Sequence, residues 1–221
     1  SNVLRCGRLP RSSRLRRSNC FQDGHSGKCY SISPPYPGEW RKLQAFRHLG
    51  LILSLSIVHT ADWQLGKPFG SIEGDAAAVL REQRYDTIRR IGEEATKRSA
   101  AAVLVAGDVF DSVTTPDQVI RRALETMKSF SGPWVLLPGN HDPLRAESPW
   151  THLKTIGHPE NVIPAVTPAP IIIADGNLAV LPAPLTRKHE PDDVTRWMDN
   201  AETPPGAFRV GLAHGSVTNR L

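Results

Sequence analysis

Beyond residue 29 this chain of 221 residues has no cysteine, because Cys6, Cys20 and Cys29 all lie near its start. Disulfides therefore do not stabilise the rest of the chain, and a reducing, cytoplasmic location is expected. A zinc site made of Cys20, His25 and Cys29 lacks a fourth ligand nearby, and we do not favour it.

The chain also has no apolar run long enough to cross a bilayer. The longest run, Leu49–Val58, spans ten residues, whereas a membrane-spanning helix needs about 20. We therefore predict no membrane association. A basic segment followed by such a run resembles a secretory signal, but the run leads to Asp62 without a cleavage-like segment. We interpret it as the first core strand.

The positive charge is unevenly distributed. The net charge is +5, yet residues 1–50 hold ten basic and two acidic side chains, whereas residues 51–221 hold 17 basic and 20 acidic ones. Residues 1–48 are rich in Arg, Ser, Pro and Gly without helical or strand periodicity, which predicts a disordered basic leader. Its composition also suits a transit peptide or a nucleic-acid-binding tail. We predict a catalytic domain over residues 49–221, which is mildly acidic, as expected where carboxylates surround cations.

Short apolar runs alternate with amphipathic segments from residue 51 onward, and this pattern predicts an α/β fold. The expected helices cover residues 75–98, 116–130, 148–156 and 192–199. After a first strand that ends before Asp62, the expected strands cover residues 101–106, 134–137, 161–163, 171–174, 178–181 and 209–213. A hairpin turn is predicted at Asp175-Gly176-Asn177. The first half is therefore βαβαβ and the second half is richer in β-structure.

Three polar motifs directly follow apolar runs. Their side chains are Asp62, Asp108 and Asn140-His141, and the runs before them are Ile52–Val58, Ala102–Ala106 and Trp134–Leu137. The carboxyl ends of neighbouring parallel strands meet at one edge of a sheet, so these side chains should converge. Carboxylate and amide oxygens are hard ligands that suit divalent cations. The pattern therefore predicts a two-metal site.

Asp108, within Gly107–Asp111, is the strongest candidate ligand, because a carboxylate can bridge two cations roughly 3.5–4 Å apart. Gly107 lets the backbone approach closely. Taken alone, Asp108 could simply cap a loop, but the neighbouring motifs favour the ligand role. Asp62 supplies a second carboxylate to the first cation. His59, inside the strand, is interpreted as a core or supporting histidine.

Asn140 offers an amide oxygen to the second cation. His141 is then a candidate catalytic residue that protonates the leaving oxygen or stabilises the transferred phosphoryl group. Asp142 is predicted to orient the His141 ring. His214, at the end of the last strand, is a further candidate ligand for the second cation.

These motifs resemble those of the calcineurin-like metallophosphoesterases, whose second and third motifs stand intact at Gly107–Asp111 and Gly139–Asp142. The segments His59–Gly66 and Gly211–Gly215 are more specifically similar to SbcD-type DNA repair exonucleases. The resemblance implies two facing mixed β-sheets flanked by helices. It also implies a metal-dependent phosphodiesterase, usually with manganese, in which a metal-bound hydroxide attacks phosphorus in line.

In this family pattern, Asp62 and Asp108 hold the first cation, and Asp108, Asn140 and His214 hold the second. His141 acts on the phosphoryl group or the leaving oxygen. The implied partners are DNA, a second copy of the subunit in a homodimer, and an SbcC-like coiled-coil ATPase.

Two departures from the pattern affect the expectations. Gln64 stands where the family has histidine, so this predicted ligand is neutral and longer, and the first site should be weaker or altered. The chain also stops at Leu221, before a closing Gly-His-x-His motif and a DNA-contacting cap, so we expect a C-terminally incomplete domain with little activity alone. The alternative functions are a small-substrate phosphoesterase and an inactive scaffold subunit.

Overall fold

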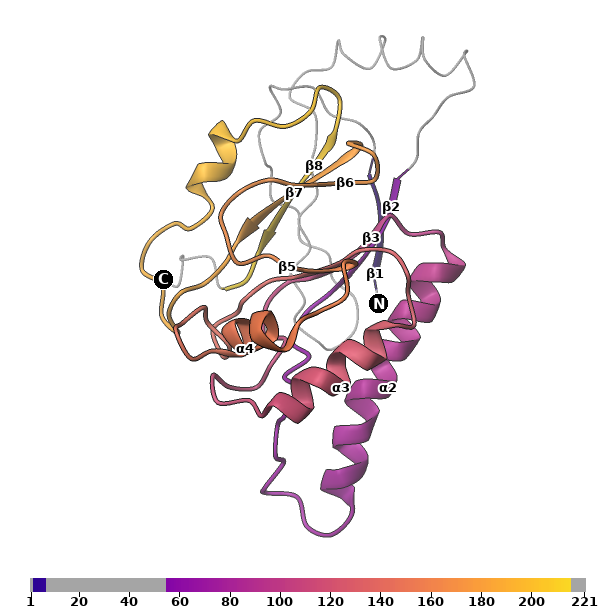
Figure 1. Ribbon diagram of the computed structural model, residues 1–221, viewed down its shortest axis with the longest axis vertical. Helices are drawn as coiled ribbons and strands as arrows, with labels where there is room; N and C mark the ends of the chain where they lie inside the picture. The colour runs from indigo at the N-terminus through magenta and orange to yellow at the C-terminus, as the bar shows by residue number, and fades with distance from the viewer. Residues whose placement is uncertain (1, 7–54, 216–221) are drawn as a thin grey trace, which may run out of the picture.

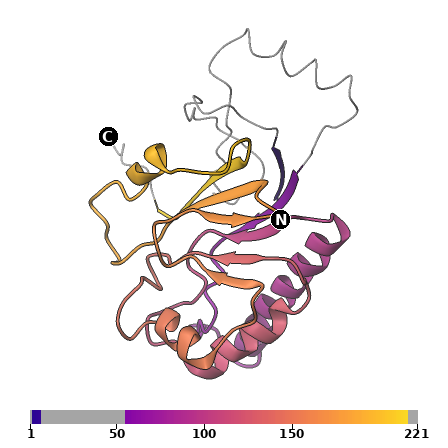
Figure 2. The ribbon, with the colours of Figure 1, turned by 45° about the horizontal axis from the view of Figure 1, so that its top comes forward.

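Two β-sheets lie face to face, and α-helices cover the outer face of the larger sheet (Figure 1). The computed structural model describes residues 2–6 and 55–215, with side chains from residue 55 onward. Figure 2 shows the layers edge-on, with the smaller sheet on one side and the helices on the other. The predicted α/β architecture of two sheets is confirmed.

The larger sheet has the order β1-β2-β3-β4-β5, and β1 is its antiparallel edge strand while the others run parallel. Its strands are β1 (Asn2–Cys6), β2 (Leu55–Thr60), β3 (Ala102–Val105), β4 (Trp134–Leu136) and β5 (Val162–Pro164). The helices that connect them are α2 (Ala76–Lys97), α3 (Asp117–Met127) and α4 (Pro149–Ile156). The predicted βαβαβ half is therefore confirmed.

The smaller sheet consists of β6 (Ile171–Ile173), β7 (Leu178–Ala183) and β8 (Phe208–Ala213). The predicted hairpin joins β6 to β7 antiparallel, with Asn177 N–H donating to the Ala174 carbonyl. Strand β8 pairs parallel with β7. The chain therefore enters β8 from the same end of the sheet as β7, and both strands finish on the side where the polar motifs lie.

Side chains along the strands of the larger sheet point alternately to its two faces, so the apolar core has two parts. Ile57, Leu104 and Val135 pack between the sheets against the apolar side chains of β7 and β8. Their neighbours along the strands, Val58 and Trp134, pack against the helices. Both faces of β3 and β4 are thus buried, which explains why these strands have no polar alternation.

Two predictions for individual segments differ from the structure. The helix expected over residues 192–199 is the short 3-10 helix η1 (Arg196–Asn200). The Asp193 carboxylate accepts bonds from the N–H and hydroxyl of Thr195, at 2.9 and 2.6 Å, and this local turn competes with α-helix formation. Residues Asn2–Cys6 of the predicted disordered leader form β1, because their backbone pairs with the edge of β2.

The remainder of that leader lies outside the described residues, as do the Cys20, His25 and Cys29 set and residues 49–54 of the first apolar run. Among the helices that the structure describes, none combines the length and apolar character needed to cross a membrane.

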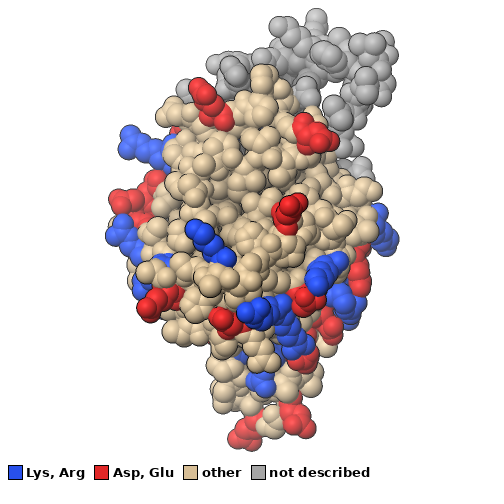
Figure 3. Space-filling model, viewed as in Figure 1, with Lys and Arg blue, Asp and Glu red and all other residues tan. Residues whose placement is uncertain are grey.

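Charges of both signs mix on the helical side of the molecule. Figure 3 shows basic and acidic side chains interspersed over the lower half of the view, where α2 and α3 lie. Several form ion pairs, such as Arg122 with Glu82 between the helices and Arg89 with Glu93 within α2. On the face shown in Figure 3, neither sign of charge dominates.

Candidate metal centre

The polar motifs begin at the same height along neighbouring strands of the larger sheet. Thr60, Val105 and Leu136, near the ends of β2, β3 and β4, are direct neighbours in register. The loops that carry Asp62, Asp108 and Asn140 therefore leave the same edge of the sheet. His214 immediately follows β8, so the smaller sheet contributes the fourth segment.

Backbone hydrogen bonds join the first two loops. The N–H groups of Asp62 and Gln64 donate to the carbonyls of Gly107 and Asp108, at 3.1 and 2.8 Å. Asp62, Gln64 and Asp108 all have positive φ, at 58°, 43° and 53°. Such values cost energy for residues other than glycine, and they cluster where surrounding contacts hold a functional site in place.

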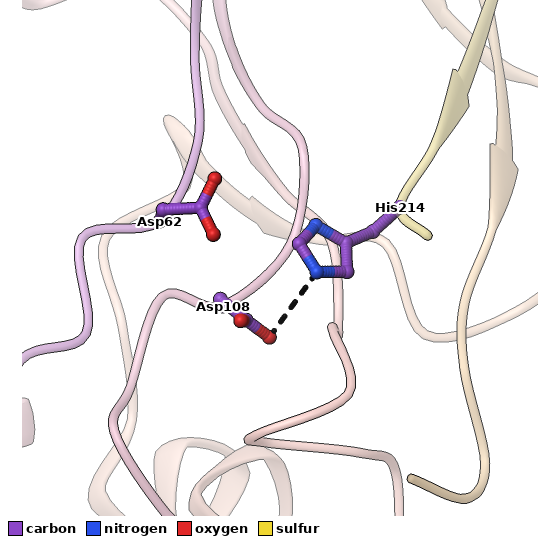
Figure 4. A group of neighbouring side chains, drawn as sticks. All are labelled: Asp62, Asp108 and His214. Atoms are coloured by element: carbon purple, nitrogen blue, oxygen red, sulfur yellow. Dashed lines mark ion pairs between the residues drawn. The ribbon is translucent and has the colours of Figure 1, made fainter. Parts of the chain in front are cut away.

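Three side chains from these segments meet. Each of Asp62, Asp108 and His214 has a ligand atom within 4.8 Å of the others, a spacing at which they could hold a metal ion. In Figure 4 the Asp62 carboxylate points toward the other two side chains, and the Asp108 carboxylate faces the His214 ring. The shortest distance between His214 Nε2 and Asp108 Oδ1 is 3.5 Å. The structure thus brings together three of the predicted ligands.

Two glycines make this convergence possible. A Cβ atom at Gly107 would lie 2.3 Å from Cγ of His214, and the residue has a φ of 82°. A Cβ atom at Gly139 would lie 2.1 Å from Oδ1 of Asp108. Both distances are far below van der Waals contact, so any other residue would displace a predicted ligand. The role of Gly139 was missed in the sequence, although its place before Asn140 mirrors that of Gly107 before Asp108.

His214 is held in a defined orientation. Its Nδ1 lies 2.7 Å from the carbonyl oxygen of Ala106, which can only accept, so Nδ1 carries the hydrogen. Its Nε2 then faces the centre, 2.9 Å from Oδ1 of Asn140. Metal-binding histidines commonly donate their other ring N–H to a carbonyl in this way. Asn140 thereby joins the cluster through its predicted amide oxygen.

The negative charge of Asp108 and the positive charge of protonated His214 stabilise each other. Burial acts to raise the pKa of Asp108, but hydrogen bonds from the His214 ring and from the His141 N–H, at 3.0 Å, outweigh it, so the pKa lies below its usual value. Burial acts to lower the pKa of His214, and the bond to Asp108 reverses this and raises it to about 8. Without a cation, the pair is therefore an ion pair below that pH.

Asp142 does not orient the His141 ring as predicted. Its fully buried carboxylate accepts bonds from the backbone N–H groups of Phe110 and Gly139, at 2.9 and 2.7 Å. Burial raises its pKa to about 7, against the lowering effect of these two donors. Asp142 therefore ties the Asp108 loop to the Asn140 loop. The His141 Nδ1 instead lies 3.2 Å from the Asp111 carbonyl, which leaves Nε2 without that constraint.

Gln64, predicted to bind the first cation, also makes a different contact. Its Oε1 accepts a hydrogen bond from Nζ of Lys67, at 2.9 Å, and the same ammonium lies 3.8 Å from Oδ1 of Asp111. Lys67 was missed in the sequence. The signal was its position three residues after Gln64, because the Lys67 N–H donates to the Gln64 carbonyl in a tight turn.

The loop that carries Gln64 is anchored from the helical side. Arg84, on α2, donates to the carbonyl of Trp63, and its guanidinium stacks 5.0 Å from the centre of the Phe69 ring. Burial lowers the pKa of Arg84, although Asp111 counters this. His59 lies half-buried in β2, where burial lowers its pKa, and it is outside the three-residue cluster.

The donor set determines what the site could bind. Two carboxylates, one imidazole nitrogen and one amide oxygen form a mixed set. Carboxylates and carbonyls suit magnesium and manganese, and imidazole also suits zinc and iron. The residues present therefore fit a divalent cation, and the assignment of each as a ligand stays a prediction.

Comparison with known proteins gives a consistent result. A family model described as calcineurin-like phosphoesterase matches residues 55–217. The SbcD component of the SbcCD nuclease of Bacillus subtilis (strain 168) is 34% identical over 137 residues, which cover 57% of this chain and 34% of that protein. The corresponding protein of Rhodobacter capsulatus is 32% identical over 111 residues, or 47% of this chain and 25% of the relative.

A third relative is the uncharacterized metallophosphoesterase YhaO of Bacillus subtilis (strain 168), which is 26% identical over 118 residues, or 51% of this chain and 28% of its own. The matched segment thus spans about a third or less of the length of these relatives.

Proposed function

The chain belongs to the calcineurin-like phosphoesterase family, and from that membership we propose that it is the catalytic part of an SbcD-type DNA repair nuclease. The proposed reaction is metal-dependent hydrolysis of DNA phosphodiesters, as an exonuclease or endonuclease. The single observation that carries the proposal is the meeting of Asp62, Asp108 and His214 from three loops far apart in the sequence. The similarity to named nuclease subunits supports a nucleic acid as the substrate.

Asp62, Asp108, Asn140 and His214 would hold the metal, with manganese as the favoured ion. When bound, a divalent cation polarises the phosphate and supplies Lewis-acid chemistry. The Ala106 carbonyl fixes the His214 tautomer for this role. The Asp142 carboxylate positions the two loops that carry Asp108 and Asn140.

His141 would act on the substrate. Its Nδ1 is engaged by the Asp111 carbonyl, so its Nε2 is the atom that can donate a proton to the leaving oxygen or a hydrogen bond to the phosphoryl group. The anchored backbone of His141, whose N–H is bound to Asp108, keeps the ring next to the cluster.

The proposal extends to the whole protein that contains this chain. There we propose a homodimer working with an SbcC-like coiled-coil ATPase, in the cytoplasm, on DNA. A closing histidine motif and a DNA-contacting cap beyond Leu221 would complete the site, as the family pattern implies.

The test compares two substrates in the presence of Mn²⁺: linear duplex DNA and a generic aryl phosphodiester. We expect weak hydrolysis of DNA, in keeping with the little activity expected of this chain alone, and its loss in Asp108→Asn, a variant that keeps the size of the side chain. Hydrolysis of the aryl phosphodiester alone would favour a small-substrate phosphoesterase. Hydrolysis of neither, with normal binding to the ATPase partner, would favour an inactive scaffold subunit.

A further inference from the structure

A basic cavity lies between the loop after β2 and the helices α2 and α3. Its volume is about 200 Å³, which is room for a group much larger than a water molecule. Residues 51–221 as a whole carry 17 basic and 20 acidic side chains. The cavity has the opposite balance, with four cationic side chains and one carboxylate in its lining: Lys67, Arg81, Arg84, Arg122 and Glu82.

The cavity lies at the same edge of the larger sheet as the candidate metal centre. Helices α2 and α3, side by side in Figure 1, follow the carboxyl ends of β2 and β3, so their amino-terminal halves begin where the polar loops leave the sheet. Oδ1 of Asp111 lies 3.8 Å from Nζ of Lys67, and the Asp111 carbonyl oxygen lies 3.2 Å from Nδ1 of His141. A single residue, Asp111, therefore connects the lining of the cavity to the candidate catalytic histidine.

Two of the arginines are held in place by the loop after β2. Nη1 of Arg81 donates to the Pro68 carbonyl at 2.9 Å, and the guanidinium of Arg84 lies 5.0 Å from the centre of the Phe69 ring. Because a guanidinium has several N–H donors, one bond to the loop leaves others for a ligand. A guanidinium that is already fixed loses little freedom on binding, and its paired donors match the oxygens of a phosphate group.

The carboxylate in the lining does not cancel the positive charge. Nη1 of Arg122 donates to Oε1 of Glu82 at 2.7 Å, so these two residues form a neutral pair and leave three cations. Asp111, which is not part of the lining, offsets one of the three. Two positive charges remain, and an anionic group in the cavity would be attracted to them.

We propose that this cavity is a phosphate subsite, in which Lys67, Arg81 and Arg84 bind a backbone phosphate of the nucleic-acid strand that enters the metal centre. This inference rests on the proposed function, because it assumes that the substrate is a nucleic acid. The subsite holds the strand by charge-assisted hydrogen bonds while a different phosphate is hydrolysed at the metal centre. A contact to the backbone positions the strand without selecting its sequence.

The test measures binding of a fluorescently labelled single-stranded oligonucleotide by anisotropy, in EDTA, so that neither hydrolysis nor a bound metal contributes. We expect Arg81→Gln to weaken binding by about tenfold, the effect of losing one hydrogen bond between charged groups. The plot of log affinity against log salt concentration should also become shallower by about 0.7, the value for one phosphate contact on a single strand. Arg81→Lys, which keeps the charge, should recover part of the lost affinity.

Arg90→Gln is the matched control, since Arg90 is exposed on the same helix and does not line the cavity. It should leave both the affinity and its salt dependence as in the parent chain. Residues 1–48 are the same in every variant, so a contribution of the basic leader cancels in the comparison.

The possible outcomes separate this inference from the proposed function. Oligonucleotide binding that is unchanged in Arg81→Gln, or absent in a parent chain that still hydrolyses DNA with Mn²⁺, would overturn the subsite and leave the proposed function intact. The subsite would also be overturned if Arg81→Gln altered only the binding of inorganic phosphate, or only the sedimentation of the chain as it pairs with a second copy. A parent chain that neither binds nor hydrolyses nucleic acid would refute both.

Discussion

The two sides of the candidate metal centre are built differently. On one side Asp108 is buried, bound by the His141 N–H and the His214 ring, and reached only because Gly139 has no side chain. On the other side Asp62 is exposed, and Gln64 is engaged by the flexible side chain of Lys67. The buried side is preorganised for a cation, whereas the exposed side can rearrange.

This contrast follows from the strands beneath the site. The loops after β3 and β4 are joined by the Asp142 carboxylate, and the end of β8 closes over them through His214. The loop after β2 has one such neighbour, the loop after β3. It is otherwise anchored by Arg84, by Arg81 through the Pro68 carbonyl, and by the buried side chains of Trp63 and Leu65. A substitution on the buried side should therefore change folding and binding together, whereas one on the exposed side should change binding alone.

The largest expected effect is on stability, in Asp142→Ala at pH 8. This change leaves two buried N–H groups without an acceptor, at about 1–3 kcal/mol each, so the free energy of unfolding should fall by about 2–6 kcal/mol. Urea unfolding measures it. Asp142→Asn, which keeps one acceptor, should lose less. An unchanged free energy in Asp142→Ala would show that the two loops do not depend on this carboxylate.

The next prediction compares how much each side of the centre contributes to Mn²⁺ affinity. Asp108→Ala should weaken Mn²⁺ binding by more than about 100-fold, the upper end of the loss seen when a group that merely supports a ligand is removed. Asp62→Ala should lose about tenfold, because an exposed position can be filled by water. Isothermal titration calorimetry measures both, with exposed Glu202→Ala as control. Equal losses of Mn²⁺ affinity in the two variants would contradict the proposed difference between the buried and the exposed side.

Gly139→Ala should act on folding and binding at once. Its Cβ would lie 2.1 Å from Oδ1 of Asp108, so either the loop or the carboxylate must move. Overpacking of this kind costs about 1–3 kcal/mol. Gly70→Ala is the control, because a Cβ there meets nothing within 4 Å. The temperature of thermal unfolding and the Mn²⁺ affinity should both fall in Gly139→Ala. Neither should change in Gly70→Ala.

The last prediction is a pH dependence of metal binding, of about tenfold for each pH unit. The pKa of His214 is raised to about 8 in the chain without a cation, so below that pH a proton occupies the nitrogen that the cation needs. Mn²⁺ affinity should therefore rise by about tenfold per pH unit from about pH 6 and level off above pH 8. Titrations at several pH values test this. In His214→Gln the slope should be lost, and a slope that persists there would assign the proton to another group.

The sequence predicts the frame of this molecule well, because its signals are local. Unbroken apolar runs predict β3 and β4, and the amphipathic segment after Asp75 predicts α2 within a residue or two of its ends. The rule that parallel strands share an edge predicts that Asp62, Asp108 and Asn140 approach one another. The position of His214 does not follow from this rule, because β8 belongs to the smaller sheet and the rule says nothing of how the two sheets face each other.

The sequence did not predict the individual side-chain contacts. Each of these side chains has several possible hydrogen-bond partners nearby, and only the three-dimensional structure shows which one it binds. Asp142 follows His141 directly, but burial and two backbone donors direct its carboxylate away from that ring. Gln64 could equally have faced a cation, and in the structure its Oε1 accepts a hydrogen bond from Lys67 instead. The 3-10 form of η1 likewise depends on the side chain of Asp193 rather than on helical periodicity.

The most direct test of the central claim is a crystal structure of the chain soaked in Mn²⁺, with the ion located by its anomalous signal. We predict a manganese peak in direct contact with the ligand atoms of Asp62, Asp108 and His214. A peak elsewhere, or side chains of these three residues turned away from the ion, would contradict it.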